Sequence, residues 1–479
     1  MAWRAETPCG AFGLGHCGWN GKLAAVTNAN GFVTAYAYDV MDRVTNIAWR
    51  TTAGASLGGF AYEYDAVGRI VSRRHSLGDP SNLSQSSQKA YAYDDLDRLV
   101  SDGGVAYAYD AAGNRMTKTE NGETVVYTLG DGDRLVSYGR ARSPSAPQLV
   151  DVCGVYSYDA AGNVTQIVRN GGPTLDLVWN GQYQLVSVST NGVFAEGYAY
   201  DALGRRAATT TREGTTRHVY DDGWQVVADI DGEGNVLASY VWGEGIDRLL
   251  AVKIGGESYY PLTDIQGTVW GYVNSQNNIV ARWQYDAWGN VVEESVSVPA
   301  LATLRYRFQG REWSAATGLT NFRMRWYDSV TGRWLSKDPI GLSGGLNLYV
   351  FCGNSPNLHV DPRGELWPQL AIGLGVVYFV YTQVRNFINR KKKMESADIN
   401  DPSDLIEKAI DVTVDMLTDI TPVTGPPSPT DTTAPVVDAV KDIAIKPIWN
   451  KPFDNVRPSR QNRRKCVDYE GGQIRRLGE

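Results

Sequence analysis

The sequence has very little of the residues that build metal centres and disulfide scaffolds. Only 4 of its 479 residues are histidine, and its 5 cysteines contain no CxxC pair. Neither a zinc finger nor a disulfide-rich fold is therefore indicated, and we expect no metal and no cofactor. The net charge of −7 gives no general reason to expect a nucleic-acid partner.

Targeting segments and low-complexity patterns are also scarce. The opening MAWRAETPCGAFGLGHC has no apolar core of the length found in a signal peptide. No Gly-X-Y period runs through the chain, which excludes a collagen-like protein. With 43% hydrophobic and 21% charged residues, the composition is that of a folded protein rather than a disordered one.

What the chain has in excess is glycine and tyrosine. It contains 51 glycines, 27 tyrosines and 14 tryptophans, a pattern typical of many short strands joined by tight turns. Length alone would predict about three domains. A search for internal repeats changes that expectation.

One short unit recurs along the first 300 residues. An aromatic-rich strand ends in Tyr-Asp, two further residues follow, then Gly or Asp with Arg or Asn, and a second apolar strand begins, as in AYEYDAVGRIVSR. The pairs that define the unit are Tyr38 and Asp39, Tyr64 and Asp65, Tyr109 and Asp110, Tyr158 and Asp159, Tyr200 and Asp201, and Tyr285 and Asp286.

Elementary chemistry predicts the structure of one unit. Alternating residues in AYAYD place rings on one face of a strand, as a period of two requires. The Asp carboxylate can accept backbone N–H groups two residues on, and the following Gly tolerates a positive φ. Each unit should therefore be a β-hairpin. Because one hairpin is not stable alone, the hairpins must stack into a shared sheet.

A denser, non-repeating block covers residues 301–366. It contains FQGRE, YDSVTGRW, DPIGLSGGLNLY and DPRG. The upstream unit resembles the repeat of the YD-repeat proteins, which include bacterial Rhs proteins, Tc-toxin C subunits and teneurins. The block itself resembles the Rhs repeat-associated core. This resemblance implies an all-β fold: a spiralling antiparallel hairpin sheet over 1–300, forming a partial shell, with 301–366 as its cap.

The resemblance also implies that the chain cuts itself. In many family members two aspartates of the core act as an aspartic-protease-like pair, and the matching residues are Asp338 and Asp361. Two carboxylates held close together cannot both ionise easily, so one keeps a proton and the other can activate water. An arginine, Arg333 or Arg325, would orient the pair by charge-assisted hydrogen bonds.

By the same match, the cut would fall between Leu366 and Trp367. The chain departs from the family pattern here, because Glu365 stands between DPRG and Leu366. One inserted residue shifts the bond by about 3.3 Å in extended chain. The competing interpretation is structural: Asp-Pro commonly starts a turn, with Pro fixing φ and Asp accepting backbone N–H groups.

The composition changes over residues 367–479, where the family carries a variable toxin region. We expect an apolar helix at 368–388, which could contact a membrane through 370–384, and a second helix at about 401–419. A Pro- and Thr-rich linker at 420–436 precedes a basic end. No histidine occurs in this tail, which excludes His-dependent nuclease centres, and nucleic acid is not the favoured partner.

Two functions remain open from the sequence. The resemblance implies a shell that encapsulates or presents a C-terminal effector in bacterial competition, with a cognate immunity protein and a secretion-system carrier as partners. Such a protein would be secreted or displayed on a bacterial surface. The alternative is a surface or membrane-anchored adhesion protein with no enzymatic activity.

Overall fold

The computed structural model divides the chain into two units, residues 1–375 and 376–479. It describes residues 7–9, 15–17, 22–78, 87–143, 146–243 and 247–365, all of them in the first unit. The predicted cleavage position, Leu366 and Trp367, and every segment predicted for the tail lie outside the described residues.

The described residues of the first unit form one sheet of 27 strands. Every strand pairs antiparallel with the strands directly before and after it, so the chain runs up and down along the sheet. The first part comprises β1 (Thr7–Cys9), β2 (Gly15–Cys17), β3 (Leu23–Thr27), β4 (Val33–Tyr38), β5 (Val44–Arg50), β6 (Ser56–Tyr64), β7 (Ile70–Leu77), β8 (Ser87–Tyr93), β9 (Leu99–Asp102), β10 (Val105–Tyr109), β11 (Arg115–Glu120), β12 (Glu123–Gly130), β13 (Arg134–Ser143) and β14 (Ala146–Tyr158).

The second part of the sheet continues the same up-and-down path. It comprises β15 (Val164–Arg169), β16 (Leu175–Trp179), β17 (Leu185–Thr190), β18 (Val193–Tyr200), β19 (Arg206–Thr210), β20 (Thr215–Tyr220), β21 (Val226–Ile230), β22 (Val236–Trp242), β23 (Leu249–Ile254), β24 (Glu257–Thr263), β25 (Val269–Val273), β26 (Ile279–Tyr285) and β27 (Val291–Val296).

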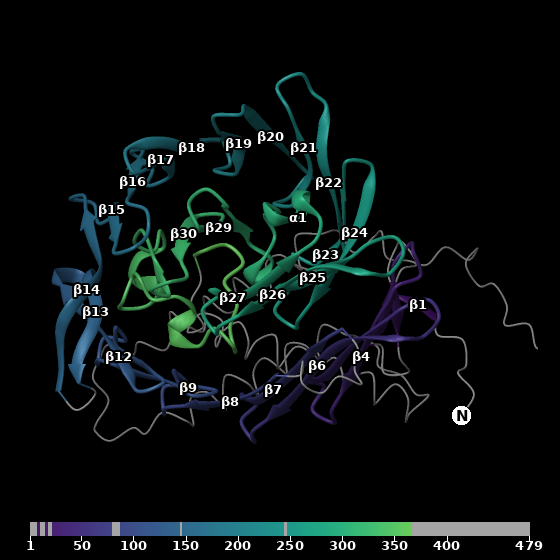
Figure 1. Ribbon diagram of the computed structural model, residues 1–479, viewed down its shortest axis with the longest axis horizontal. Helices are drawn as coiled ribbons and strands as arrows, with labels where there is room; N and C mark the ends of the chain where they lie inside the picture. The colour runs from purple at the N-terminus through teal and green to yellow at the C-terminus, as the bar shows by residue number, and fades with distance from the viewer. Residues whose placement is uncertain are drawn as a thin grey trace, which may run out of the picture. The chain divides into compact units, whose positions relative to one another are not determined.

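The sheet curls around its own concave face, from β4 past β13 and β18 to β26 (Figure 1). Turns far apart in the sequence meet where the curl returns. The side-chain amide of Asn30 donates to the carbonyl of Asn274 at 3.2 Å and to Oδ1 of Asn277 at 3.1 Å. Among the described strands β1 and β27 do not pair with each other, so the sheet forms a partial shell. The all-β fold predicted from the repeat is confirmed.

The turn of each repeat follows the predicted chemistry. In the turn after β4, Oδ1 of Asp39 accepts the N–H groups of Met41 at 2.9 Å and Arg43 at 3.0 Å. Oδ2 of Asp39 accepts Nε of Arg43 at 2.7 Å. The residue before the arginine, Asp42, has a φ of 71°, and at the same place in the next unit Gly68 has a φ of 95°. These Tyr-Asp turns all lie along one edge of the sheet, the turn edge.

The repeat tyrosine links each unit to the one before it. The hydroxyl of Tyr64, at the end of β6, donates to the carbonyl of Val44, the first residue of β5, at 2.6 Å. In two units tryptophan replaces the tyrosine, and its indole N–H donates to the equivalent carbonyl. The same bond is made by Tyr38, Tyr93, Tyr109, Tyr158, Trp179, Tyr200, Tyr220, Trp242 and Tyr285. Each repeat therefore includes a hydrogen bond to the repeat before it.

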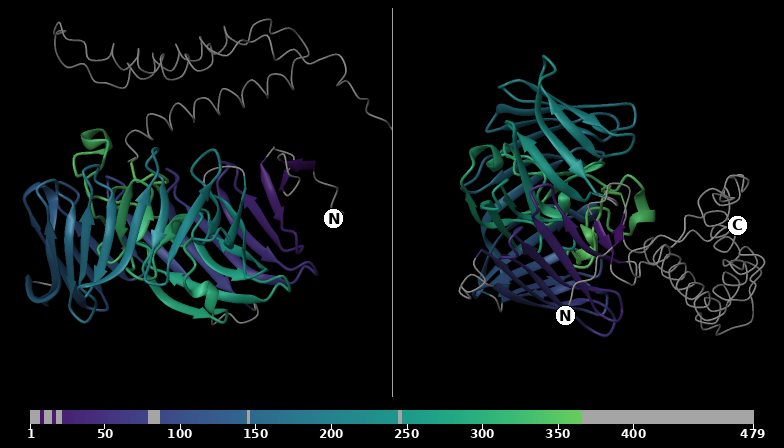
Figure 2. Two further views of the ribbon diagram at one scale, coloured as in Figure 1. Left: turned by 90° about the horizontal axis from the view of Figure 1, so that it is seen from above. Right: turned by 90° about the vertical axis from the view of Figure 1, so that its right-hand side faces the viewer.

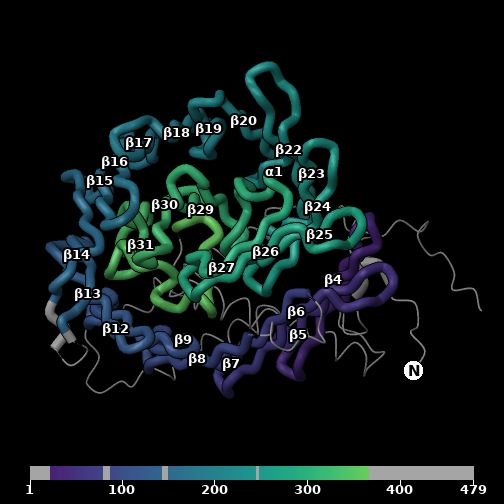
Figure 3. Tube along the Cα trace, viewed as in Figure 1, coloured from purple at the N-terminus to yellow at the C-terminus, as the bar shows by residue number. Residues whose placement is uncertain are grey.

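Residues 299–365, which we call the plug, fill the concave side of the sheet (Figures 1 and 3). The plug begins with a short helix, α1 (Pro299–Ala302), and contains a small sheet of β28 (Glu312–Trp313), β29 (Thr320–Phe322), β30 (Arg325–Asp328) and β31 (Arg333–Trp334). Its centre is aromatic: Phe322, Tyr327, Trp334 and Phe351 are at most 2% exposed, and their rings pack edge-on or tilted.

The plug is seated on the turn edge by hydrogen bonds to the turns themselves. Asn354 donates to the carbonyl of Gly113 at 2.7 Å, and the hydroxyl of Tyr349 donates to the carbonyl of Gly162 at 2.7 Å. Seen from above, the strands of the sheet lie side by side (Figure 2). The sheet and the plug therefore pack together.

Candidate active site

Two aspartates of the plug are brought together by one guanidinium. Arg325 is the first residue of β30, and its Nη2 lies 2.9 Å from Oδ2 of Asp338 and 3.1 Å from Oδ2 of Asp361. All three residues are buried, with exposed fractions of 2% for Arg325, 7% for Asp338 and 2% for Asp361. The predicted pair is therefore adjacent in space, although its two members lie 23 positions apart in sequence.

Asp361 also holds the chain that leads to the predicted cleavage position. Its Oδ1 accepts the N–H groups of Gly364 at 2.7 Å and Glu365 at 3.2 Å. Nε of Arg325 donates to the carbonyl of Gly364. Gly364 has a φ of 69°, a conformation that suits glycine because it has no Cβ. One carboxylate thus fixes the turn that ends directly before Leu366.

The side chain of Asp338 is closely packed. Its Oδ1 accepts the N–H of Ile340 at 3.1 Å, which makes it the start of a turn. Gly344 packs directly against it, since a Cβ there would lie 2.6 Å from Oδ2 of Asp338. Gly344 of DPIGLSGG therefore leaves the space that the carboxyl group occupies.

The surroundings of Asp338 change its titration. Burial raises the pKa of Asp338 to about 6, and the charges of Asp361 and Glu365 add to that rise while Arg325 opposes it. Burial also lowers the pKa of Arg325, which the two carboxylates counteract. A carboxyl group with a pKa near 6 can still hold a proton near neutral pH and donate it in a reaction.

Arg325, and not Arg333, contacts the pair. Nη1 of Arg333 donates to Oδ1 of Asn114 at 3.0 Å, and Nη2 donates to the carbonyl of Asp133. In the small sheet Arg333 is paired with Asp328, and its side chain reaches the turn edge of the large sheet. Arg333 thus helps to hold the plug against the large sheet. Of the two arginines, Arg325 is the one placed to orient the carboxyl groups.

Several charged residues at the contact between the large sheet and the plug were not predicted. Asp328 is 1% exposed, and its carboxylate accepts Nη2 of Arg169 at 2.7 Å and the hydroxyl of Tyr156. A second cluster joins His218 and Asp229 of the sheet to Arg305 of the plug. The YD of YDSVTGRW marked Asp328 as part of a motif, but no local signal in the sequence marked His218.

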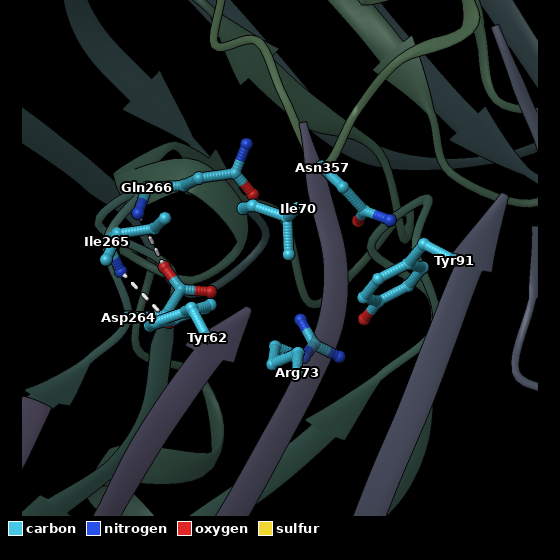
Figure 4. Close-up of a pocket in the computed structure, with 8 residues that line it drawn as sticks. All are labelled: Tyr62, Ile70, Arg73, Tyr91, Asp264, Ile265, Gln266 and Asn357. Carbon is cyan, nitrogen blue, oxygen red and sulfur yellow. Dashed lines mark hydrogen bonds between the residues drawn. The ribbon is translucent and has the colours of Figure 1, made fainter. Parts of the chain in front are cut away.

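Other kinds of site find little support in the described part of the chain. A cavity of about 10 Å³ lies between the sheet and the loop after β24 (Figure 4), where Arg73 and Tyr91 turn toward the same space; this is room for about one water. No group of three metal-ligating side chains is close enough to hold an ion in those residues. None of the described helices has the length and apolar character needed to cross a membrane.

One family model matches most of the repeats and most of the plug in a single stretch. The model of the teneurin YD-shell matches residues 53–356, and the model of the RHS repeat matches residues 20–56. The first match covers more than half of the chain and includes Asp338, but it ends before Asp361.

Relatives include several bacterial toxins. The chain is 30% identical to the tRNA3(Ser)-specific nuclease WapA of Bacillus spizizenii, over 74% of this chain and 15% of that protein. It is 27% identical to the toxin protein Tse5 of Pseudomonas aeruginosa, over 66% and 28%. It is 26% identical to the toxin subunit YenC2 of Yersinia entomophaga, over 72% and 42%. The chain thus spans less than half the length of these relatives.

Solved structures share the fold. The crystal structure of TcdB2-TccC3-TEV superposes with a TM-score of 0.56 at 22% identity, covering 73% of this chain and 19% of that one. The Photorhabdus luminescens Tc holotoxin pore gives a TM-score of 0.55 at 20% identity, covering 73% and 19%. At this identity the likeness is evidence for the fold of the sheet and plug.

Proposed function

Because this chain belongs to the teneurin YD-shell family, we propose that it is the plugged end of a toxin-associated shell that presents a C-terminal effector. Residues 367–479 would be that effector. The relatives support this proposal, since a tRNA nuclease and a toxin subunit share the shell region with this chain. Its partners would be an immunity protein and a secretion-system carrier, and its location secreted or on the cell surface.

We further propose that the plug cuts the chain between Leu366 and Trp367. The observation that carries this proposal is the single guanidinium of Arg325 within 3.1 Å of both carboxylates. The guanidinium holds the two carboxyl groups next to each other, and it opposes the rise in the pKa of Asp338 that burial and the charge of Asp361 produce. The hydrogen bonds from Gly364 and Glu365 to Asp361 bring the end of the plug to this pair.

The roles follow from the pKa of Asp338. Asp338 holds its proton up to about pH 6, so it would donate a hydrogen bond to the Leu366 carbonyl oxygen. Asp361 would take a proton from water, whose oxygen adds to the carbonyl carbon. The C–N bond then breaks, and the amine of Trp367 takes up a proton. Hydrolysis leaves a carboxyl end at Leu366 and an amino end at Trp367.

The test is a denaturing gel of the purified chain beside its Asp338→Asn variant. Self-cleavage predicts two fragments from the native sequence and one band from the variant. Asp39→Asn is the matched control, because Asp39 is a repeat-turn carboxylate that accepts N–H groups of its own turn, from Met41 and Arg43. Fragments that persist in Asp338→Asn, or a native chain that stays whole, would contradict the cleavage.

A second candidate function has its own support. Asp338 and Asp361 both accept N–H groups within their own turns, as purely structural Asp-Pro turns would. With the inserted Glu365, the plug would then be a seal without enzymatic activity, and the protein a surface adhesion or structural shell. Expression of residues 367–479 alone in a bacterium separates the two: growth arrest supports the effector, and normal growth supports the adhesion protein.

A further inference from the structure

A buried ionic cluster joins the wall of the sheet to the plug. Its centre is His218 of β20, whose side chain is 1% exposed. Nδ1 of His218 lies 2.7 Å from Oδ1 of Asp229 on β21, and Nε2 lies 2.9 Å from the hydroxyl of Thr209 on β19. Because a carboxylate can only accept, Nδ1 carries a proton. Nε2 can accept from the hydroxyl of Thr209 or, when protonated, donate to it, so these two bonds form in either protonation state.

The plug supplies the other half of the cluster. Nη2 of Arg305 lies 3.0 Å from Oδ1 of Asp229, and its Nη1 lies 3.2 Å from Oε2 of Glu312 and 3.0 Å from Nδ1 of His218. Glu312 in turn pairs with Arg206 of β19. Two of these three ion pairs therefore cross between sheet and plug, and the imidazole lies beside them.

With a neutral imidazole, the charges of the cluster balance. The charged or titratable groups around His218 are Arg206 on β19, Tyr220 on its own strand, Asp229 on β21, Tyr240 on β22, and Arg305, Tyr306 and Glu312 on the plug. Burial raises the pKa of each of the three tyrosines, so they stay neutral. Two arginines then face two carboxylates, and a proton on His218 would add a third buried cation.

We propose that His218 makes the seat of the plug sensitive to acid: its protonation places a third buried cation against Arg305, repels that guanidinium and loosens the plug from β20 and β21. The proposal goes beyond the proposed function, since it concerns the seat of the plug and needs no self-cleavage. A shell whose plug stays bound to the sheet near neutral pH would thus open at its plugged end in an acidic compartment.

The direction and size of the effect follow from linkage. Burial, with Arg305 second, lowers the pKa of His218 to about 4, whereas a released imidazole titrates near 6.5. As the pH falls below about 6.5, the released form gains a proton that the seated form does not take up until about pH 4. Between about pH 7 and about pH 5, the ratio of released to seated plug should rise about 20-fold.

Hydrogen exchange of the plug segment 305–314 measures this opening directly. The chain should carry Asp338→Asn, which keeps it intact and removes the titration of that carboxyl group. We expect the opening, corrected for intrinsic exchange rates, to rise about 20-fold from about pH 7 to about pH 5. In His218→Gln, a neutral side chain that keeps a donor and an acceptor, most of this rise should disappear.

Two further variants keep the proposal testable if His218→Gln does not fold. His218→Phe keeps a ring in the same space but cannot take up a proton, so most of the rise should disappear there too. His75→Gln is the matched control, because His75 is also buried but lies away from this cluster, against Trp270 and Ser87. It should leave the acid response of 305–314 intact. A response in His218→Gln or His218→Phe equal to that of the native residue would overturn the proposal.

Discussion

The bond that links each repeat to the next can be tested at Tyr64. Tyr64→Phe removes only the hydroxyl, which donates to the carbonyl of Val44 at 2.6 Å. The ring stays, and with it the packing of the Arg43 guanidinium over its face at 4.6 Å. The substitution therefore isolates one hydrogen bond between neighbouring hairpins.

The magnitude follows from the position of the bond. Tyr64 is partly buried, so the carbonyl of Val44, which loses its hydrogen-bond donor, regains some contact with water. A net loss of about 1 kcal/mol in the free energy of unfolding is expected. Urea unfolding followed by tryptophan fluorescence should show a lower midpoint with an unchanged slope, because the surface exposed on unfolding is the same.

Two further variants make the test decisive. Tyr183→Phe is the control, since Tyr183 lies at a turn tip and is 57% exposed; its midpoint should not move. Tyr200→Phe removes the equivalent bond to Leu185, made at 2.7 Å. Because the two sites are distant, the losses in a Tyr64→Phe and Tyr200→Phe double variant should add. If Tyr64→Phe is as stable as Tyr183→Phe, the hydroxyl does not hold the units together.

Three other outcomes are expected from the plug. If Asp338 donates the proton, cleavage should slow as the pH rises through about 6; a rate of fragment formation that is flat across this range would count against that role. Arg169→Ala leaves the buried carboxylate of Asp328 without its cation and should lower the free energy of unfolding in urea by about 3 kcal/mol. Arg140→Ala, which breaks a pair exposed to solvent, should cost less than about 1 kcal/mol, and equal losses would be inconsistent with a buried seat. Gly364→Ala places a Cβ 2.7 Å from the carbonyl of Phe322 at a positive φ; the displaced turn should slow cleavage about 100-fold, and an unchanged rate on the gel would show that this turn is not needed.

The hairpins could be predicted because their signals are local. The carboxylate of Asp39 reaches backbone N–H groups only two and four residues away, and the positive φ falls on the Gly or Asp of the motif. The hydroxyl bond from Tyr64 to Val44 spans 20 residues. Sequence indicated that a tyrosine recurs there, but the carbonyl it binds depends on the pairing of the strands.

The candidate pair could be predicted only through the family resemblance. Asp361 and Arg325 are 36 residues apart, and nothing local indicates that they meet. Arg333 is nearer to Asp338 in sequence, yet its side chain reaches Asn114, which is 219 residues away. Which arginine holds the carboxylates is decided by the packing of the plug.

The seat of the plug was the least predictable part of the structure. Arg305 lies 87 residues after His218, and Asp328 lies 172 residues after Tyr156. Such pairs carry no period and no motif. They arise because the curl of the sheet brings distant strands to face one inserted segment, so only the three-dimensional arrangement reveals them.

The most direct measurement for the proposed function is mass spectrometry of the purified chain, with the new chain ends identified. Self-cleavage by the pair that Arg325 holds predicts a fragment ending at Leu366 and a second beginning at Trp367. Both should be absent from Asp338→Asn and from Asp361→Asn. A single intact mass for the native chain, or the same fragments from either variant, would contradict an active plug and leave it as a structural seal.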